Sequence, residues 1–379
     1  MKRSPWIAVV AAALVLSGCA APAQPPAQSP APSPTPTPTA SSDPLEGLST
    51  EQRVGQLFVV GTTASGAEEA TLSAVRDRQV GGVFLGGRAK GGVDATAGVV
   101  GQLTALANPA LPLLVATDQE GGEVQVLQGP GFSAMPSAVE QGALPPEQLA
   151  ADATTWGAEL AAAGVTLNLA PVVDLIPSAA AAATNPPIGG FDRQFGYDVD
   201  GIVSHADAFR SGMTASGVGS VVKHFPGLGE VTGNTDDTAG VTDTTTAADS
   251  PSVDVYRSEI AAGVDSIMMS SAVYSRLDPA APAVFSPAVV TDLLRGELGF
   301  DGVVMTDDVS GATQVTAWTP ADRAILAIEA GCDIVLVSRT PTVAAEMIDA
   351  VVAKAKAEPE FAVQVDAAAT RVLALKALR

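Results

Sequence analysis

The chain has 379 residues, with 41 acidic and 20 basic side chains and a formal net charge of −21. This charge argues against nucleic-acid binding, because contact with phosphates needs clustered basic side chains. The length exceeds that of a small module and suits one large α/β barrel.

The N-terminal segment has the organisation of a secretory signal. A basic tip precedes an apolar run from Trp6 to Leu16, which is too short for a membrane-spanning helix. The following LSGC sequence resembles the bacterial lipoprotein cleavage box, in which the cysteine, here Cys19, becomes lipidated. We therefore expect a lipoprotein signal peptide over 1–19 and a chain held on the outer face of the bacterial cell membrane by this lipid alone. The alternative is an ordinary signal peptide with a chance cysteine.

Residues 20–45 are mostly Ala, Pro, Ser, Thr and Gln, a composition that cannot bury a core and predicts a disordered tether. The barrel domain is then expected over 46–379. The second cysteine, Cys332, lies in the apolar run CDIVLV, so we expect an inert core thiol and no disulfide.

Short β-branched runs alternate with alanine-rich helical segments along this domain. Two clear helical segments are 146–164 and 287–299, and a last amphipathic helix (361–379) is expected to close the outer ring. Continuous apolar strands joined by crossover helices indicate a parallel sheet that is buried on both faces. Eight segments are strand candidates: 55–61, 81–87, 112–118, 166–174, 219–225, 265–271, 301–307 and 332–338. They predict a (β/α)8 TIM-like barrel with a single catalytic domain.

Polar residues follow several of these strands, at the end of a barrel where active sites are built. They are Asp118, Asp174, Lys223, His224 and Asp307. Each alone could simply cap a loop, but their shared position at strand ends favours a common function.

Several kinds of site are disfavoured by the sequence. A metal site is unexpected because the chain has only two histidines, His205 and His224, and His205 falls in a helical segment. No G-x-S-x-G elbow and no G-x-G-x-x-G after a strand is present, which argues against a serine triad and a dinucleotide cofactor. We therefore expect no cofactor, and the paired carboxylates favour glycoside hydrolysis.

Five motifs then match a known family: VATDQEGG (115–122), NLAPVVDL (168–175), KHFPGLG (223–229), MTDD (305–308) and AGCDIVLV (330–337). In order and spacing the chain resembles, over nearly all of 46–379, the single-domain bacterial β-N-acetylglucosaminidases of glycoside hydrolase family 3. The resemblance implies a TIM-like barrel that removes terminal β-linked N-acetylglucosamine, often from cell-wall fragments. It also implies a retaining mechanism through a covalent glycosyl-aspartate.

Site residues follow from the same resemblance. Asp307, the first aspartate of the S/T-D-D element, matches the nucleophile. Asp118, Lys223 and His224, with Arg193 of the FDRQFG element, match positions that hold the sugar hydroxyls and the N-acetyl group.

The chain departs from the family at the general acid/base, which is a histidine in an Asp-Ser-His element after KHFPG-x-G. Counting without gaps places Asn234, Thr235 and Asp236 there. A carboxyl group is the acid/base of most other glycosidases, so Asp236 is the candidate and Asp237 its nearest rival. The alternative is that both merely decorate a Gly- and Thr-rich loop. An ionised Asp236 would repel phosphate, so hydrolysis is expected rather than phosphorolysis.

A second departure concerns the substrate. The family usually has R-V-Q-R after DQEGG, whereas this chain has Glu123 and Val126 at the two arginine positions. The pocket could therefore suit another substituent, as in a β-glucosidase or a phosphorylase variant. The rival hypothesis is a catalytically weak or inactive glycan-binding barrel lipoprotein. The expected partner is a carbohydrate in either case, and the chain is expected to be a monomer.

Overall fold

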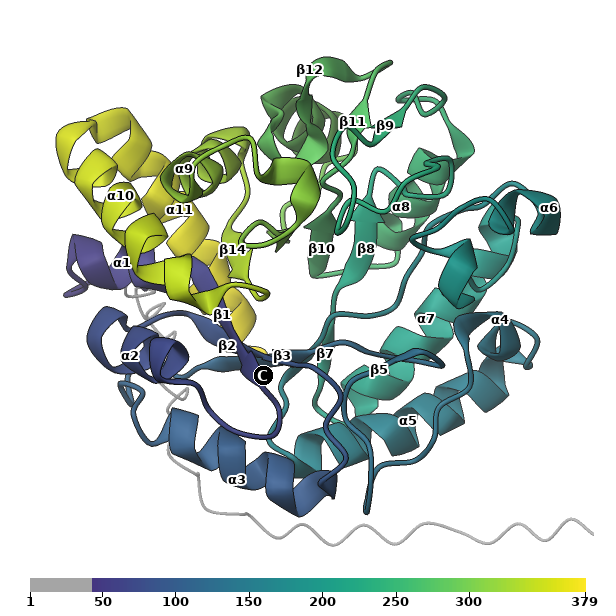
Figure 1. The fold of residues 1–379 in the computed structure, drawn as a ribbon, viewed down its shortest axis with the longest axis horizontal. Helices are drawn as coiled ribbons and strands as arrows, with labels where there is room; N and C mark the ends of the chain where they lie inside the picture. Colours follow the sequence, from purple (N-terminus) through teal and green to yellow (C-terminus); the bar gives the residue numbers. More distant parts are fainter. Residues whose placement is uncertain (1–42) are drawn as a thin grey trace, which may run out of the picture. The chain divides into compact units, whose positions relative to one another are not determined.

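Parallel strands arranged around one axis form the centre of the protein in the computed structural model, which describes residues 43–379 (Figure 1). The predicted signal peptide (1–19), Cys19 and most of the predicted tether (20–45) lie outside the described residues. Asp43–Arg379 form one compact unit, and Leu45 is already buried in its core.

The barrel strands follow the chain in order around the ring. They are β1 (Phe58–Thr63), β2 (Gly82–Gly86), β3 (Leu114–Thr117), β6 (Leu167–Asn168), β7 (Gly219–Ser220), β8 (Val222–Phe225), β10 (Ser266–Met269), β13 (Val303–Asp308) and β14 (Ile334–Val337).

The ring is nearly closed. β1 pairs with both β2 and β14, and the sheet ends at β7 and β8, which only Val221 separates. The nine strands are therefore eight stretches of chain, each within a predicted strand or displaced from it by one or two residues. The prediction of a (β/α)8 TIM-like barrel is confirmed.

Helices cover the outside of the ring (Figure 1). The helices are α1 (Thr50–Gln56), α2 (Glu69–Arg78), α3 (Gly92–Thr104), α4 (Ala138–Gln141), α5 (Pro146–Ala162), α6 (Ala179–Ala182), α7 (Val199–Ala215), α8 (Pro251–Ala261), η3 (Ala288–Glu297), α9 (Pro320–Ala330), α10 (Ala344–Ala357) and α11 (Pro359–Lys376), with short 3-10 turns η1 (Gly189–Phe191), η2 (Ala283–Phe285), η4 (Thr313–Val315) and η5 (Pro341–Val343). The segments predicted over 146–164 and 287–299 correspond to α5 and η3, and η3 is a π-helix.

Two apolar clusters hold these layers together. One lies between the strands and the outer helices, and the other fills the inside of the barrel with alternate residues of successive strands. Such layered filling makes the barrel interior a packed core and leaves its ends for function.

The last helix does more than close the outer ring. The first half of α11 packs in the outer cluster, but Val372 and Leu375 belong to the interior cluster. Farther along, Arg379 pairs with Asp265, which immediately precedes β10. The end of α11 thus seals the barrel at the amino-terminal ends of its strands, near the centre of the view in Figure 1.

Small sheets lie at the other end. β4 (Gln119–Gly121) follows β3 directly and pairs with β5 (Val124–Gln125), whereas β9 (Thr242–Asp243), β11 (Val273–Tyr274) and β12 (Asp278–Pro282) form a three-stranded sheet. Among residues 43–379, no helix combines the length and hydropathy needed to cross a bilayer.

Candidate active site

A pocket of about 520 Å³ opens at the carboxyl ends of the barrel strands. Its lining includes all six side chains predicted to act on the substrate: Asp118, Arg193, Lys223, His224, Asp236 and Asp307. Asp237 and Asp174 are not part of the lining. The described residues hold no group of three or more His, Cys, Asp or Glu side chains suited to a metal ion.

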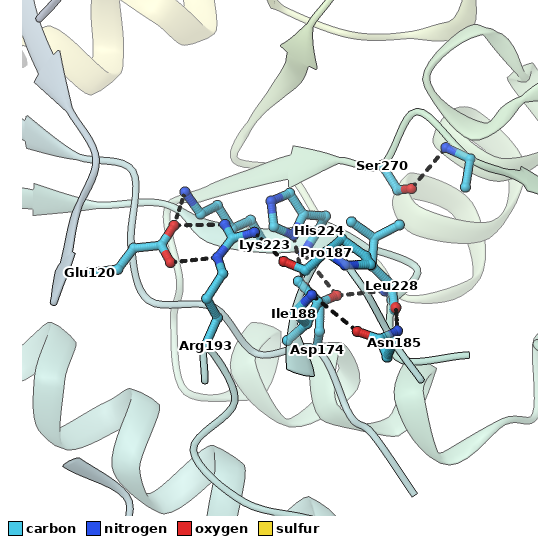
Figure 2. A network of polar contacts seen from close by, with 12 residues as sticks. Glu120, Asp174, Asn185, Pro187, Ile188, Arg193, Lys223, His224, Leu228 and Ser270 are labelled. Carbon is cyan, nitrogen blue, oxygen red and sulfur yellow. Dashed lines mark hydrogen bonds and ion pairs between the residues drawn. The ribbon is translucent and has the colours of Figure 1, made fainter. Parts of the chain in front are cut away.

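A buried ionic network joins Glu120 to Arg193 and Lys223, and these two cations line the pocket (Figure 2). Glu120 accepts two hydrogen bonds of 2.8 Å from the guanidinium of Arg193 and lies 2.7 Å from Lys223 Nζ. Lys223 also donates to Asp118 Oδ1 at 2.6 Å. Burial alone would raise the pKa of Glu120, but the two cations dominate and lower it to about 2. Glu120, Arg193 and Lys223 are therefore ionised at neutral pH and fixed in direction.

Sequence reasoning missed Glu120, although a signal was present. Asp118 and Glu120 are two residues apart in extended chain, so their side chains lie on the same face. Because these two carboxylates share one face and Lys223 ends a nearby strand, the sequence could have predicted an ionic network that includes Glu120.

Loop contacts place Arg193, which comes from no strand. Its Nη1 donates to the Pro187 carbonyl oxygen at 2.9 Å, and Asn185 accepts from the Ile188 backbone N–H at 3.0 Å. The Asn185 amide also donates to the carbonyl oxygen of Leu228 at 2.7 Å, which joins this loop to the KHFPGLG segment (Figure 2).

Asp174, one of the predicted strand-end acids, orients His224 instead of lining the pocket. Its Oδ2 lies 2.8 Å from His224 Nδ1, and its Oδ1 accepts from the backbone N–H of Leu228 at 2.7 Å. If Nδ1 carries a proton for this bond, Nε2 is the nitrogen available to a ligand.

The glycines of KHFPGLG allow the loop to pack this closely. Gly227 has φ +131°, a conformation that favours glycine, and a Cβ on Gly229 would lie 1.7 Å from the Leu175 carbonyl oxygen. The loop therefore packs against the end of the neighbouring strand segment only with glycine at these positions.

Asp307 lies in β13, near its carboxyl end, and its Oδ1 accepts from the Asp308 backbone N–H at 2.7 Å. Burial raises the pKa of Asp307 to about 6, with a further contribution from Asp236, while His224 and Lys223 oppose the shift. Two carboxyl groups in one pocket, one of which raises the pKa of the other, are the arrangement expected for a glycosidase.

Asp236 and Asp237 differ in their access to the pocket. The Asp236 side chain is half-exposed and lines the pocket, whereas that of Asp237 is 70% exposed and lies outside the lining. Burial raises the pKa of Asp236, Asp308 and Asp237 raise it further, and Arg339 lowers it. Of the two acids, the geometry favours Asp236.

The two positions without the usual arginines have different surroundings. Val126 lines the pocket, whereas Glu123 is exposed and is not among the lining residues. Arg88, which follows β2, lines the pocket and donates to the Glu123 carbonyl oxygen at 2.6 Å. A rim cation therefore comes from a different loop, which the motif comparison could not reveal.

The remaining histidine and cysteine lie away from the pocket lining. His205 is on α7, where its ring nitrogens contact the carbonyl oxygens of Gly201 and Leu144 at 2.7 and 2.9 Å. Cys332 is a buried free thiol, and burial raises its pKa, as predicted for an inert core residue.

Comparison with known proteins identifies the family of the chain. Residues 49–375 match the family model described as the glycosyl hydrolase family 3 N-terminal domain. The chain is similar to a β-hexosaminidase from Stenotrophomonas maltophilia, with 38% identity over 241 residues that cover 60% of this chain and 67% of the relative.

Solved structures extend the similarity. The crystal structure of a β-N-acetylhexosaminidase from Beutenbergia cavernae is 65% identical and has a TM-score of 0.86, covering 87% of this chain and 99% of that one. A family 3 β-N-acetylglucosaminidase from a Paenibacillus strain is 29% identical with a TM-score of 0.78, covering 87% and 62%. The chain belongs to glycosyl hydrolase family 3.

Proposed function

We propose that this chain is a retaining β-N-acetylhexosaminidase that removes terminal β-linked N-acetylglucosamine from cell-wall-type glycans. The observation that carries the proposal is that Asp307 and Asp236 line the same pocket. The charge of Asp236 also contributes to the raised pKa of Asp307. The similarity to β-hexosaminidases supports the choice of sugar.

The proposed sugar-binding groups are Asp118, Arg193, Lys223 and His224, and Glu120 supports the two cations among them from behind the pocket lining. Lys223 and Arg193 can only donate hydrogen bonds at neutral pH, whereas Asp118 can accept them from hydroxyl groups. Because Glu120 fixes both cations, their donors are oriented before the sugar arrives.

The proposed reaction has two steps. An Asp307 carboxylate oxygen bonds to the anomeric carbon as the glycosidic C–O bond breaks, and the Asp236 carboxyl proton passes to the leaving oxygen. In the second step the ionised Asp236 takes a proton from water. The water oxygen bonds to the anomeric carbon, and the ester bond to Asp307 breaks.

A chromogenic β-N-acetylglucosaminide tests the activity directly. We expect the wild-type chain to release chromophore and Asp307→Asn to be slower by a factor of about 10³ or more. If both proteins released chromophore equally slowly, the enzymatic function would be contradicted and the rival hypothesis of a glycan-binding barrel would be favoured.

Asp236 has a separate test with a matched control. Asp236→Ala should lose about 10²-fold or more with poor leaving groups, keep most activity with good ones, and be rescued by azide. Asp237→Ala, an exposed neighbour outside the pocket lining, should be close to wild type. A full-rate Asp236→Ala enzyme would remove the assignment.

The acceptor and the substituent at C2 need their own measurements. We expect N-acetylglucosamine as the main product even in excess phosphate, since an ionised Asp236 repels the dianion. Dominant N-acetylglucosamine 1-phosphate would contradict this.

Because Val126 and Glu123 replace two cations, β-glucosides belong in the same assay, and faster turnover of the glucoside would change the proposed substrate.

We also propose that Cys19 carries the lipid that holds the chain on the outer face of the cell membrane, as a monomer. The LSGC sequence, which resembles the lipoprotein cleavage box, supports the lipid anchor. Cys19→Ala should move the chain from the membrane fraction to the medium or periplasm, and unchanged fractionation would contradict lipid anchoring.

A further inference from the structure

Arg339, which follows β14, joins the loop carrying Asp236 to the barrel. Its Nη1 donates to the Asp236 carbonyl oxygen at 3.1 Å and lies 3.3 Å from Asp236 Oδ1. Its Nη2 lies 3.5 Å from Asp237 Oδ1. One guanidinium thus contacts the backbone and the carboxylate of the same residue. Because its donors form a rigid fork, these contacts restrict both the loop and the direction of the carboxylate.

Asp308 holds Arg339 in turn. Asp308 Oδ1 accepts from the backbone N–H groups of Ser338 at 2.8 Å and Arg339 at 3.3 Å. The Ser310 hydroxyl donates to the same oxygen at 2.6 Å and accepts from the Thr340 backbone N–H at 2.9 Å. A continuous series of polar contacts therefore runs from the nucleophile's own strand to Asp236.

Other contacts hold the loop by its backbone. The Asp236 carbonyl oxygen also accepts from Thr313 N–H at 3.0 Å, and the Thr235 carbonyl accepts from Gln314 N–H at 3.0 Å. The Gln314 amide exchanges hydrogen bonds of 2.8 and 3.1 Å with the Val241 backbone. Within residues 43–379, Arg339 is the only cationic side chain paired with the Asp236 carboxylate.

We infer that Arg339 is the positioning residue of the general acid/base: it directs the Asp236 carboxylate into the pocket and stabilises its ionised form. This inference rests on the proposed function. The ionised form is needed in the second step, when Asp236 accepts a proton from water. Asp307 and Asp308 on β13 and Asp237 on the same loop oppose a charge at Asp236, whereas Arg339 and Arg193 favour it.

The test uses Arg339→Gln and Arg339→Lys. Arg88→Gln is the control, because the Arg88 guanidinium also lines the pocket but makes no hydrogen bond or ion pair with Asp236. Two substrates are compared, an activated dinitrophenyl glycoside and a poorly activated alkyl glycoside. For Arg339→Gln we expect kcat/KM to fall roughly 10- to 100-fold on the alkyl glycoside and much less on the activated one, because only the former needs proton donation. Arg339→Lys should recover part of the loss.

A pH profile separates positioning from structural support. The limb of kcat/KM on the alkyl glycoside that disappears in Asp236→Asn identifies the titration of Asp236, because that substrate needs proton donation. In Arg339→Gln this limb should move to higher pH by roughly half a unit or more, since a cation that favours the carboxylate is gone. It should stay close to wild type in Arg339→Lys and Arg88→Gln.

An equal loss on both substrates with an unmoved limb, or wild-type kinetics in Arg339→Gln, would overturn the inference. Thermal unfolding of each variant identifies losses that come from misfolding. If the wild-type chain itself does not turn over either substrate, the proposed function fails instead, so the two failures are distinguishable.

Discussion

The carboxyl group of Asp307 carries the chemistry of the proposed mechanism, and its surroundings predict a pH dependence. Burial first, and the charge of Asp236 second, raise its pKa to about 6. A nucleophile must be ionised, so the rate with an activated substrate should decline as pH falls through about 6.

Removing a neighbouring charge should move that decline. In Asp236→Ala the like charge is lost, the ionised form of Asp307 is easier to maintain, and the acidic limb of kcat/KM should shift to lower pH. Asp237→Ala, whose side chain is exposed outside the pocket lining, should shift it less. An acidic limb that is unaffected in Asp236→Ala would show that the two carboxyl groups are not coupled.

Glu120 is the carboxylate that forms ion pairs with both buried cations of the pocket, Arg193 and Lys223. Glu120→Gln leaves Arg193 without its bidentate partner, while Lys223 keeps only Asp118. An uncompensated buried charge should lower the free energy of unfolding by about 3 to 5 kcal/mol and raise KM. Urea unfolding at neutral pH measures the first effect, and a change below about 1 kcal/mol would contradict it.

The same residue predicts how stability responds to acid. Its pKa is lowered from 4.5 to about 2 in the folded chain, so the stabilisation by its charge is complete above the ordinary value. It is lost progressively as pH falls from about 4.5 toward about 2. Unfolding curves of Glu120→Gln should therefore depend less on pH in this window than those of the wild type.

At the scale of elements, α11 is a barrel plug as well as an outer helix. Leu375 is buried in the interior cluster, whereas Leu378, one turn farther, is 65% exposed. Leu375→Ala should lower the free energy of unfolding by about 2 to 5 kcal/mol, because it leaves a cavity in the barrel. Leu378→Ala should change it by less than about 0.5 kcal/mol.

The pocket lies at the opposite end of the strands, so neither variant should alter KM beyond a few-fold. Equal unfolding energies for the two variants, measured in urea, would mean that the end of α11 does not seal the barrel.

The periodic elements were predictable because burial on both faces leaves apolar strands with a clear pattern. The packing of the end of α11 inside the barrel could not be predicted from the sequence, since an amphipathic stripe indicates that a helix is packed but not what it packs against. The π-helical hydrogen bonding of η3 likewise has no signal in the pattern of apolar residues over 287–299.

At the scale of the whole molecule, the barrel brings together residues that are far apart in the sequence. Asp118, Lys223, His224 and Asp307 were predictable as neighbours because strand ends of a parallel barrel share one rim. Arg193 came only from the family motif, because a loop fastened by Asn185 and Pro187 sets its position. Arg339 and Arg88 were missed because neither belongs to a quoted motif and their contacts exist only in the folded chain.

The account depends most on Asp307 as the nucleophile. Incubation with a fluorinated N-acetylglucosaminyl donor, followed by intact mass measurement and peptide mapping, tests this most directly. We predict a single adduct with the mass of one fluorinated sugar on the peptide that contains Asp307, and no adduct in Asp307→Asn. An adduct on another residue, or turnover of the donor without any trapped species, would contradict the account.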